Sequence, residues 1–149
     1  MPQSLVQNYI HIVFSTKGRK NLISSEIGGR LYPYLYGISK NMNCYPKLIG
    51  GHLNHVHILC DLPKTVCLSK LIEQLKSSSS KWLKTQNRLD NFAWQNGYAA
   101  FSIQYSNVST VVNYIANQEI HHQTITFENE LRRLLKENAL EFDERYLWD

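Results

Sequence analysis

The sequence switches between two hydrophobic periodicities, and the order of the switches limits the possible folds more than any other feature. Residues 8–16 (NYIHIVFST) alternate with period two, and Ile10, Ile12 and Phe14 form the predicted buried face of a strand. Residues 24–43 then repeat apolar side chains at helical spacing. The folded part of the chain therefore begins with a strand followed by a helix.

The middle of the chain predicts a β-hairpin. Two β-rich runs meet near Leu53 and Asn54. The paired glycines Gly50 and Gly51 indicate a bulge or a bend in the first run. A second amphipathic pattern, over residues 65–87, predicts another helix directly after the hairpin.

Residues 97–105 (GYAAFSIQY) supply a last strand, so the order is β-α-β-β-α-β, followed by helices. This order predicts an α+β fold, a ferredoxin-like or RRM-like antiparallel sheet with helices on one face plus C-terminal helices. The 149 residues, 43% of them hydrophobic, suit a single domain over residues 1–149. We expect the core at about 8–105, the helix that carries Tyr114 at about 107–121, and a C-terminal extension at about 124–149.

The composition says little about the protein's partners and favours an intracellular location. A formal net charge of +4 and a pI near 9.0 are compatible with a polyanionic partner but do not establish one. The three cysteines are odd in number and lack C-x-x-C spacing, which favours free thiols in a reducing compartment. We find no apolar run of the roughly 20 residues that a bilayer requires, and no signal-peptide pattern. A cytoplasmic protein, associated with the nucleoid when bound to DNA, is the expectation.

The first candidate functional feature is the pair His55 and His57 in an otherwise apolar strand. Residues two apart on a strand point to the same face, so the two imidazoles project together while Val56 points to the other face. Two neutral imidazoles side by side can chelate one divalent cation. The alternative is a pair of sheet histidines that are hydrogen-bonded to water or to the backbone.

The second candidate feature is the segment 113–118 (NYIANQ). On a helix Tyr114 and Gln118 lie one turn apart on the same face. A helix packed beside the histidine strand could offer the Gln118 carbonyl oxygen to a metal and the Tyr114 hydroxyl to a substrate. The alternative is a solvated amphipathic helix with an ordinary tyrosine.

Both features occur in one order with further segments, and together they resemble a known family. The segments NHVHIL and VVNYIANQEIHH, with IHIVFSTKGR before them and WQNGYAAFSIQYS between them, are similar to the single-tyrosine HUH transposases. These belong to small bacterial insertion sequences that move as single-stranded DNA, and REP-associated tyrosine transposases are their domesticated relatives. HUH denotes histidine, hydrophobic residue, histidine. The resemblance extends over nearly the whole chain.

The resemblance implies a function, a mechanism and a cofactor. Tyr114 would attack a DNA phosphate to give a 5′-phosphotyrosine and a free 3′-hydroxyl, and another 3′-hydroxyl would rejoin the strand. The implied function is therefore a metal-dependent transposase that nicks and rejoins single-stranded DNA. The implied cation is Mg²⁺ or Mn²⁺, and its ligands would be His55, His57 and Gln118. Asp61 and Glu119 are reserve oxygen ligands.

The resemblance also implies partners. These are single-stranded DNA, with hairpin-containing element ends, and a second copy of the chain, because relatives are dimers that combine the HUH motif of one subunit with the tyrosine helix of the other. The sequence leaves open whether the tyrosine helix packs in cis or in trans. Six basic residues and one histidine are candidate DNA contacts: His11, Lys17, Arg19, Lys20, Lys76, Lys81 and Lys84. The alternative for the basic residues is an ordinary solvent-exposed position. The alternative for His11 is a structural role.

Three further groups of residues receive non-catalytic interpretations. Alternating charges on the last helix, Glu128, Glu130, Arg132, Arg133, Lys136 and Glu137, are typical of a solvated helix face. The adjacent histidines 121 and 122 follow Gln118 and could lie near the site, but they are interpreted as a polar helix end. His52 precedes His55 by an odd interval, which places it on the opposite face in a regular strand, although a turn or bulge at Leu53 and Asn54 could alter this.

Two rival functions remain open on the sequence alone. The first is an RRM-like module that binds single-stranded nucleic acid without cutting it, although the first strand lacks the aromatic signature of such a module. The second is a metal hydrolase with no covalent step, in which Tyr114 would be dispensable. A covalent protein–DNA adduct distinguishes the transposase from both.

Overall fold

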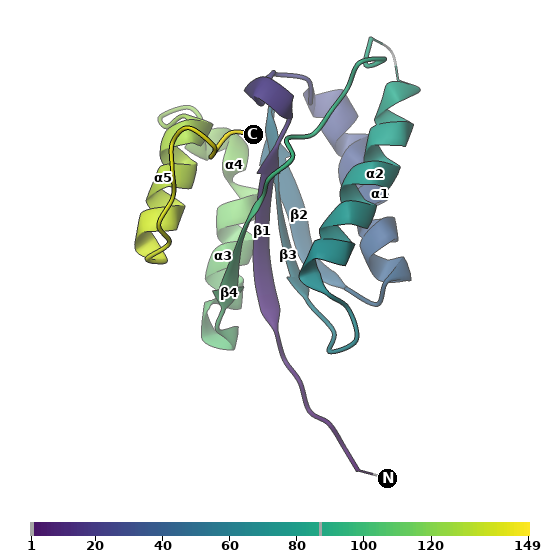
Figure 1. Ribbon diagram of the computed structural model, residues 1–149, viewed down its shortest axis with the longest axis vertical. Helices are drawn as coiled ribbons and strands as arrows, with labels where there is room; N and C mark the ends of the chain where they lie inside the picture. The colour runs from purple at the N-terminus through teal and green to yellow at the C-terminus, as the bar shows by residue number, and fades with distance from the viewer. Residues whose placement is uncertain (1, 87) are drawn as a thin grey trace.

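The structure is a computed structural model that describes residues 2–86 and 88–149 (Figure 1). Its four strands form one antiparallel sheet in the order β2-β3-β1-β4. The strands are β1 (Tyr9–Ser15), β2 (Pro46–His52), β3 (His55–Asp61) and β4 (Ala99–Ile103). The helices between them are α1 (Ser25–Asn41) and α2 (Leu68–Lys84), with a short η1 (Lys17–Arg19) after β1. The predicted α+β fold and its β-α-β-β-α-β order are confirmed.

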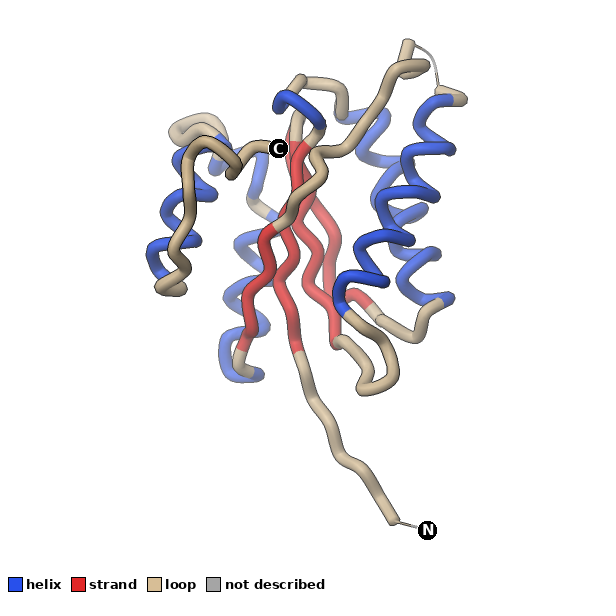
Figure 2. Tube along the Cα trace, viewed as in Figure 1, coloured by secondary structure: helices blue, strands red, loops and turns tan. Residues whose placement is uncertain are grey.

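The chain continues beyond the sheet through short helices. These are η2 (Tyr105–Asn107), α3 (Val108–Ala116), α4 (Gln118–His121) and α5 (Phe127–Glu137). Helices α1 and α2 cover one face of the sheet, and α3, α4 and α5 cover the other (Figures 1 and 2). The sheet is therefore enclosed on both sides, and every residue of β1 is buried.

The alternation of the central strands separates two layers of core. Ile12 and Phe14 of β1 and Ile58 of β3 pack with α1 and α2. Their neighbours Val13 and Leu59 point the other way and pack with the C-terminal helices. The period-two pattern of the sequence thus decides which side chains face the layer that carries Tyr114.

The hairpin between β2 and β3 turns through Leu53 and Asn54, as predicted. Of the bulge or bend predicted at the glycine pair, the bulge is wrong, because the register shift lies between Pro46 and Leu48. Gly50 instead allows a close approach: a Cβ there would lie 2.9 Å from Cγ2 and 3.0 Å from the carbonyl oxygen of Ile115 on α3. A missing side chain on β2 thus lets α3 lie directly against the sheet.

The helix predicted at about 107–121 is divided in two. Helix α3 ends at Ala116, and Asn117 has φ −102° and ψ 22° before α4 begins. The Asn117 side chain donates back to the carbonyl oxygen of Asn113 at 2.9 Å, a local bond that competes with continued helix. The break does not separate Tyr114 and Gln118, which both contact one residue of α5.

Two composition-based expectations can be compared with the described residues. Cys44 and Cys60 are buried thiols and Cys67 is an exposed one, and none of them is paired in a disulfide in this part of the chain. Within residues 2–86 and 88–149, no helix combines the length and the apolar character that crossing a bilayer requires.

Candidate metal and tyrosine site

Strand β3 presents His55 and His57 to the layer of the C-terminal helices. Both side chains are fully buried, and Val56 between them packs into the opposite core with α1 and α2. The two histidines therefore share a face, as the strand period predicts. Their rings lie 5.1 Å apart between centroids.

Each of these imidazoles is held by its Nδ1 atom. Nδ1 of His55 lies 2.9 Å from Oδ1 of Asn54, and Nδ1 of His57 lies 2.8 Å from Nε2 of His11. The Nε2 atoms of both rings consequently face the interior of the layer. Metal-binding histidines are usually oriented in this way, by a hydrogen bond at the nitrogen that does not bind the ion.

The role of His11 follows from the same contacts. It is only 3% exposed, and its ring stacks on that of His57 with centroids 5.0 Å apart. A side chain in this place supports His57 and has little surface to offer a nucleic acid. The structure therefore favours the structural alternative over the predicted DNA contact.

Helices α3 and α4 bring the two other predicted residues to the histidines. The Gln118 side chain is 1% exposed, and its Oε1 lies 2.9 Å from Nε2 of His55. The half-buried Tyr114 ring meets the ring of His57 edge-on, with centroids 5.7 Å apart. One chain thus gathers Tyr114, Gln118 and the histidine pair in a single layer.

The centre of this cluster is Glu130 of α5, which sequence reasoning missed. Its side chain is fully buried, and its Oε1 lies 3.2 Å from Nε2 of both His55 and His57. Its Oε2 accepts hydrogen bonds from the Tyr114 hydroxyl and, at 2.8 Å, from Nε2 of Gln118. The predicted solvated position of Glu130 is wrong.

The reason for this error is the way α5 packs. Phe127, Leu131 and Leu135 are buried against the sheet, and Glu130 lies in the same stripe of the helix. The alternating charges alone suggested a solvent-exposed helix face, but the spacing of the apolar residues around Glu130 indicated that this side chain is buried. Thr126 begins the helix as its N-cap and accepts a hydrogen bond from the Asn129 amide at 3.2 Å.

Two more histidines belong to the cluster. Nε2 of His122 lies 2.9 Å from Oε1 of Gln118 and 3.1 Å from Oε1 of Glu130, and Nε2 of His121 lies 3.3 Å from Oε2 of Glu130. They lie at the end of α4, as interpreted, and because the chain turns back there to meet α5 they also lie at the cluster, which was the alternative.

His52 also lies on the face of the cluster, contrary to the sequence-based interpretation. Its ring stacks on that of His122 with centroids 5.4 Å apart and an interplanar angle of 5°. It is the cross-strand partner of His55 across the two-residue turn. Paired residues of a hairpin share a face, so counting odd and even positions through the turn fails.

Burial and hydrogen bonding set the charges of the cluster. Burial lowers the pKa of His55 to about 4 and that of His11 to about 3, so both rings are neutral near pH 7. Burial opposes ionisation of Glu130, but hydrogen bonds from His122, His55 and His57 outweigh it and hold the pKa of this carboxyl below its usual range. The site therefore contains an ionised carboxylate among imidazoles.

Tyr114 is neutral in this environment. Burial, followed by the negative charge of Glu130, raises the pKa of the Tyr114 phenol above its ordinary value. A neutral phenol is a poor nucleophile, so attack requires that its proton be removed. The hydrogen bond to Oε2 of Glu130 provides an acceptor at the hydroxyl itself.

The donor atoms fit a divalent cation. A neutral imidazole carries one proton, yet His55 faces an oxygen of Asn54 at Nδ1 and oxygens of Gln118 and Glu130 at Nε2. Asn54 donates through its Nδ2 to the carbonyl oxygen of Arg19, which leaves Oδ1 toward the ring. His122 likewise faces oxygens at both nitrogens. More acceptors than protons converge here, as expected for a cation site.

One ligand set stands out among the described residues. Donor atoms of His55, His122 and Glu130 all lie within 4.8 Å of one another. Imidazoles with one carboxylate and an amide oxygen form a mixed set that suits Mn²⁺ at least as well as Mg²⁺. The reserve ligands lie elsewhere: Asp61 accepts from the Asn8 amide at the far end of β3, and Glu119 is exposed.

Several of the predicted DNA contacts already have partners within the protein. Nζ of Lys76 donates to the carbonyl oxygens of residues 95, 96 and 97 at 2.8, 3.1 and 2.7 Å, and burial lowers its pKa to about 8. Arg19 forms an ion pair with Glu128 at 3.0 Å. Lys76 thus fastens the segment before β4, and Arg19 fastens η1 to α5.

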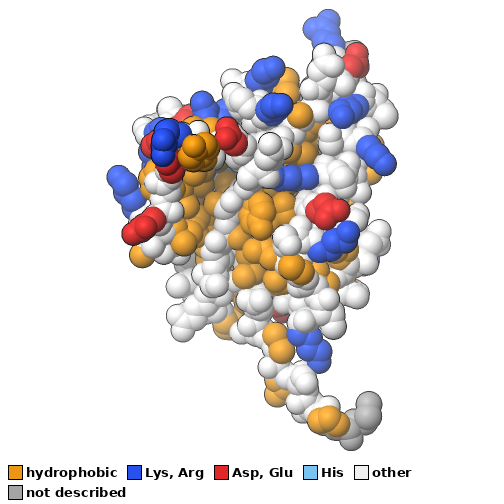
Figure 3. All heavy atoms as spheres, in the orientation of Figure 1, with side chains coloured by type: hydrophobic (Ala, Val, Ile, Leu, Met, Phe, Trp, Pro, Cys, Tyr) orange, Lys and Arg blue, Asp and Glu red, His pale blue; other side chains and the backbone are white. Residues whose placement is uncertain are grey.

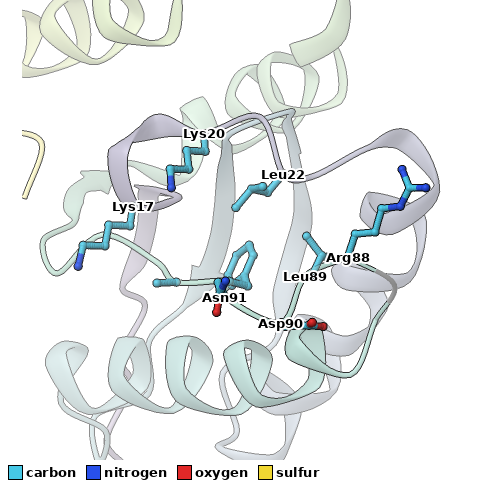
Figure 4. A pocket seen from close by; sticks show the side chains of 9 residues that line it. Lys17, Lys20, Leu22, Arg88, Leu89, Asp90 and Asn91 are labelled. Carbon is cyan, nitrogen blue, oxygen red and sulfur yellow. The ribbon is translucent and has the colours of Figure 1, made fainter.

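The remaining predicted contacts are free to meet a ligand. Lys81 and Lys84 are exposed on α2, in the layer opposite the cluster. Lys17 and Lys20 line a cavity of about 210 Å³ together with Arg88, and Leu22 lies between them (Figure 4). In the view of Figure 3 the basic side chains are spread over the surface and form no single patch.

Comparison with known proteins identifies the family. The profile described as "Transposase IS200 like" matches residues 4–118, a segment that contains His55, His57, Tyr114 and Gln118. The chain therefore belongs to the IS200-like transposase family. No curated protein shows significant similarity to it.

Solved structures agree on the fold. A structure of a REP-associated tyrosine transposase bound to a REP hairpin has a TM-score of 0.62 and 14% identity, over 96% of this chain and 91% of that one. A crystal structure of a protein assigned as a transposase, from Deinococcus radiodurans R1, has a TM-score of 0.60 and 19% identity, over 79% and 98%. Helix α5, with Glu130, lies outside the residues that the family profile matches.

Proposed function

We propose that the chain is a metal-dependent transposase that nicks and rejoins single-stranded DNA through a 5′-phosphotyrosine on Tyr114, for the transposition of a small insertion sequence. One observation carries the proposal. The Tyr114 hydroxyl, Gln118 and both imidazoles of the HUH motif converge on the carboxylate of Glu130. Membership of the IS200-like transposase family supports the same reaction class.

The proposed ligands are His55, His57 and Gln118, completed by Glu130 and His122. Bound there, Mg²⁺ or Mn²⁺ would polarise the scissile phosphate and offset the charge that develops during attack. The protein holds the donor atoms in place through Asn54 and His11, which fix the two imidazoles of β3. Burial lowers the pKa of His55 to about 4, which keeps this imidazole neutral and available near pH 7.

The covalent step would begin at the Tyr114 hydroxyl. Its proton passes to Oε2 of Glu130, which already accepts its hydrogen bond. The Tyr114 oxygen forms a bond to phosphorus, and the bond from phosphorus to the 3′-oxygen breaks. That oxygen takes a proton from solvent and leaves as a 3′-hydroxyl. In the rejoining step the oxygen of a 3′-hydroxyl bonds to phosphorus and releases its proton to solvent, the bond from phosphorus to the Tyr114 oxygen breaks, and the phenol regains its proton from Glu130.

The proposed partner is single-stranded DNA with hairpin-containing ends. A structurally similar protein has been solved with a REP hairpin bound. The tyrosine and the HUH motif meet within one chain, which supports a site built in cis. Dimer formation stays a prediction, and sedimentation of the protein with and without a hairpin oligonucleotide measures it.

The test is a covalent adduct. The protein is incubated with Mn²⁺ and single-stranded oligonucleotides that carry candidate hairpins, and denaturing gels are examined for a protein–DNA species. We expect an adduct that is abolished by Tyr114→Phe and by His55→Ala with His57→Ala. The matched control is Tyr36→Phe, since Tyr36 is exposed on α1 in the opposite layer.

Other outcomes would contradict the proposal in distinct ways. An adduct that survives Tyr114→Phe excludes Tyr114 as the nucleophile. Cleavage without an adduct indicates a metal hydrolase. Binding without cleavage, with the native element ends tested, indicates a non-catalytic RRM-like module.

A further inference from the structure

We propose that Arg133 binds the phosphoryl group that Tyr114 attacks, so that α5 supplies a phosphate-binding cation to the reaction. This inference rests on the proposed function, because it presupposes attack by Tyr114. Arg133 lies outside the residues that the family profile matches. Sequence reasoning interpreted it as part of a solvated helix face.

The first argument is proximity to the nucleophile. Helix α5 carries Glu130 and Arg133 three residues apart, hence on one side of the helix. Glu130 accepts the hydrogen bond of the Tyr114 hydroxyl, and Nη2 of Arg133 donates to the same hydroxyl oxygen at 3.3 Å. The guanidinium carbon lies 6.0 Å from the centre of the phenol ring. A positive charge is thus in place at the reacting atom.

The second argument is unused hydrogen-bonding capacity. A guanidinium has five N–H donors, and the bond to Tyr114 uses one of them. The buried Nε of Arg133 has no hydrogen-bond partner among the described residues and forms only a long ion pair with Glu137, at 3.7 Å. The side chain as a whole is 41% exposed, so a ligand can reach it from solvent. Free donors beside a nucleophile suit an incoming anion.

The neighbouring arginine shows the contrast. Arg132 donates to both carboxylate oxygens of Glu144, at 2.6 and 3.2 Å, and to Asn129 at 3.0 Å. Its guanidinium also lies 5.3 Å from the centre of the Trp148 ring. Arg132 therefore holds the segment after α5 in place, while Arg133 keeps its donors available.

The third argument is charge. A phosphodiester that approaches the Tyr114 hydroxyl also approaches the Glu130 carboxylate, whose Oε2 accepts the hydrogen bond of that hydroxyl. The planar fork of an arginine can bind two phosphate oxygens at once. When the Tyr114 oxygen bonds to phosphorus, the two non-bridging oxygens of that phosphate come close to the guanidinium of Arg133. Arg133 would hold them and reduce the repulsion from Glu130.

The test compares two arginines and two substrates. Single-turnover adduct formation is measured for the wild type, Arg133→Met and the matched control Arg132→Met, with saturating Mn²⁺. We expect Arg133→Met to slow the reaction about 100-fold, the usual loss for one donor to a developing anion, and Arg132→Met to change it less than about threefold. The second substrate replaces the scissile phosphate with an uncharged methylphosphonate, on which Arg133→Met should react nearly as fast as the wild type.

The substrate comparison separates phosphate binding from a structural role. An equal loss on both substrates, or no loss on either, overturns the inference and leaves the transposase proposal intact. An absent adduct with the wild type overturns the transposase proposal and, with it, this one. Arg133→Gln, which keeps one donor group, replaces Arg133→Met if thermal unfolding shows that the methionine variant does not fold.

Discussion

The cluster has two sides with different origins, strand β3 and helix α5. Strand β3 lies in the centre of the sheet, and its His55 and His57 have their Nδ1 atoms fixed by close neighbours. Glu130 of helix α5 lies 73 residues further along the chain than His57 and is the one buried carboxylate among residues 2–86 and 88–149. The strand side consists of imidazoles held in place by hydrogen bonds, whereas the helix side supplies a carboxylate. The proposed attack by Tyr114 requires the histidines of β3 as well as the carboxylate of α5.

Removing the charge from the helix side tests this dependence most directly. We expect Glu130→Gln to lower Mn²⁺ affinity by at least about 100-fold, because losing even an outer partner of a metal ligand costs 10- to 100-fold. Isothermal titration with Mn²⁺ measures the change. The control is Glu137→Gln, an exposed carboxylate of the same helix. If both variants bind Mn²⁺ like the wild type, α5 takes no part in the metal site.

Protonation tests the strand side. The pKa values of His55 and His11 in the folded protein, about 4 and about 3, lie below the ordinary 6.5. The unfolded chain therefore takes up protons below pH 6.5 that the folded protein does not. The free energy of unfolding should fall from pH 6.5 to about 4, by about 1.4 kcal/mol per pH unit for each ring. The raised pKa of His122 opposes part of this slope.

Urea denaturation in the presence of EDTA, at several pH values in this window, measures the slope. His11→Gln removes one of the two titrating rings while retaining a polar side chain. We expect a shallower dependence in that variant. A stability that is independent of pH in both proteins would show that the strand side is not held in the neutral state.

The packing of α3 between the two sides can be perturbed without touching a polar group. Gly50→Ala places a methyl group against Ile115, and overpacking of this kind should lower the free energy of unfolding by about 2 kcal/mol. Because Tyr114 precedes Ile115, adduct formation should slow as well. Gly29→Ala is the control, since nothing lies within 4 Å of its added Cβ and an alanine favours the helix. Equal stabilities of the two variants would contradict the close approach.

The smallest effects are expected away from both sides, at the exposed lysines. The double variant Lys17→Gln with Lys20→Gln should weaken binding of a single-stranded oligonucleotide by about threefold to tenfold at low salt. The slope of log affinity against log salt should fall by about 0.7 for each lost phosphate contact. Lys81→Gln with Lys84→Gln has the same change in charge and should bind like the wild type. The opposite ranking would place DNA on the layer of α2.

Local patterns in the sequence predicted one side of the cluster and missed the other. The shared face of His55 and His57 follows from the strand period, and the turn at Leu53 and Asn54 from the break between two β-rich runs. The burial of Glu130 depends on α5 docking against the sheet, a contact between distant segments that charge counting does not reveal. The apolar residues on either side of Glu130 were the available signal.

Two smaller errors have the same origin. The face of His52 was wrong because a two-residue turn interrupts the alternation that holds along each strand. The single helix expected over 107–121 is broken at Asn117, whose side chain and backbone N–H both donate to the carbonyl oxygen of Asn113. Periodicity predicted the elements themselves well, but it could not predict how consecutive elements are joined or which distant ones touch.

The meeting of β3 and α5 at one carboxylate has a consequence for local unfolding. A cation held by both His55 and Glu130 would act as a cross-link between the sheet and the C-terminal helices. Its binding free energy would then resist detachment of those helices, by about 2.7 kcal/mol when the ion is at 100 times its dissociation constant. Amide hydrogen exchange in α5 would slow on addition of Mn²⁺, while α1, in the opposite layer, would be nearly unchanged.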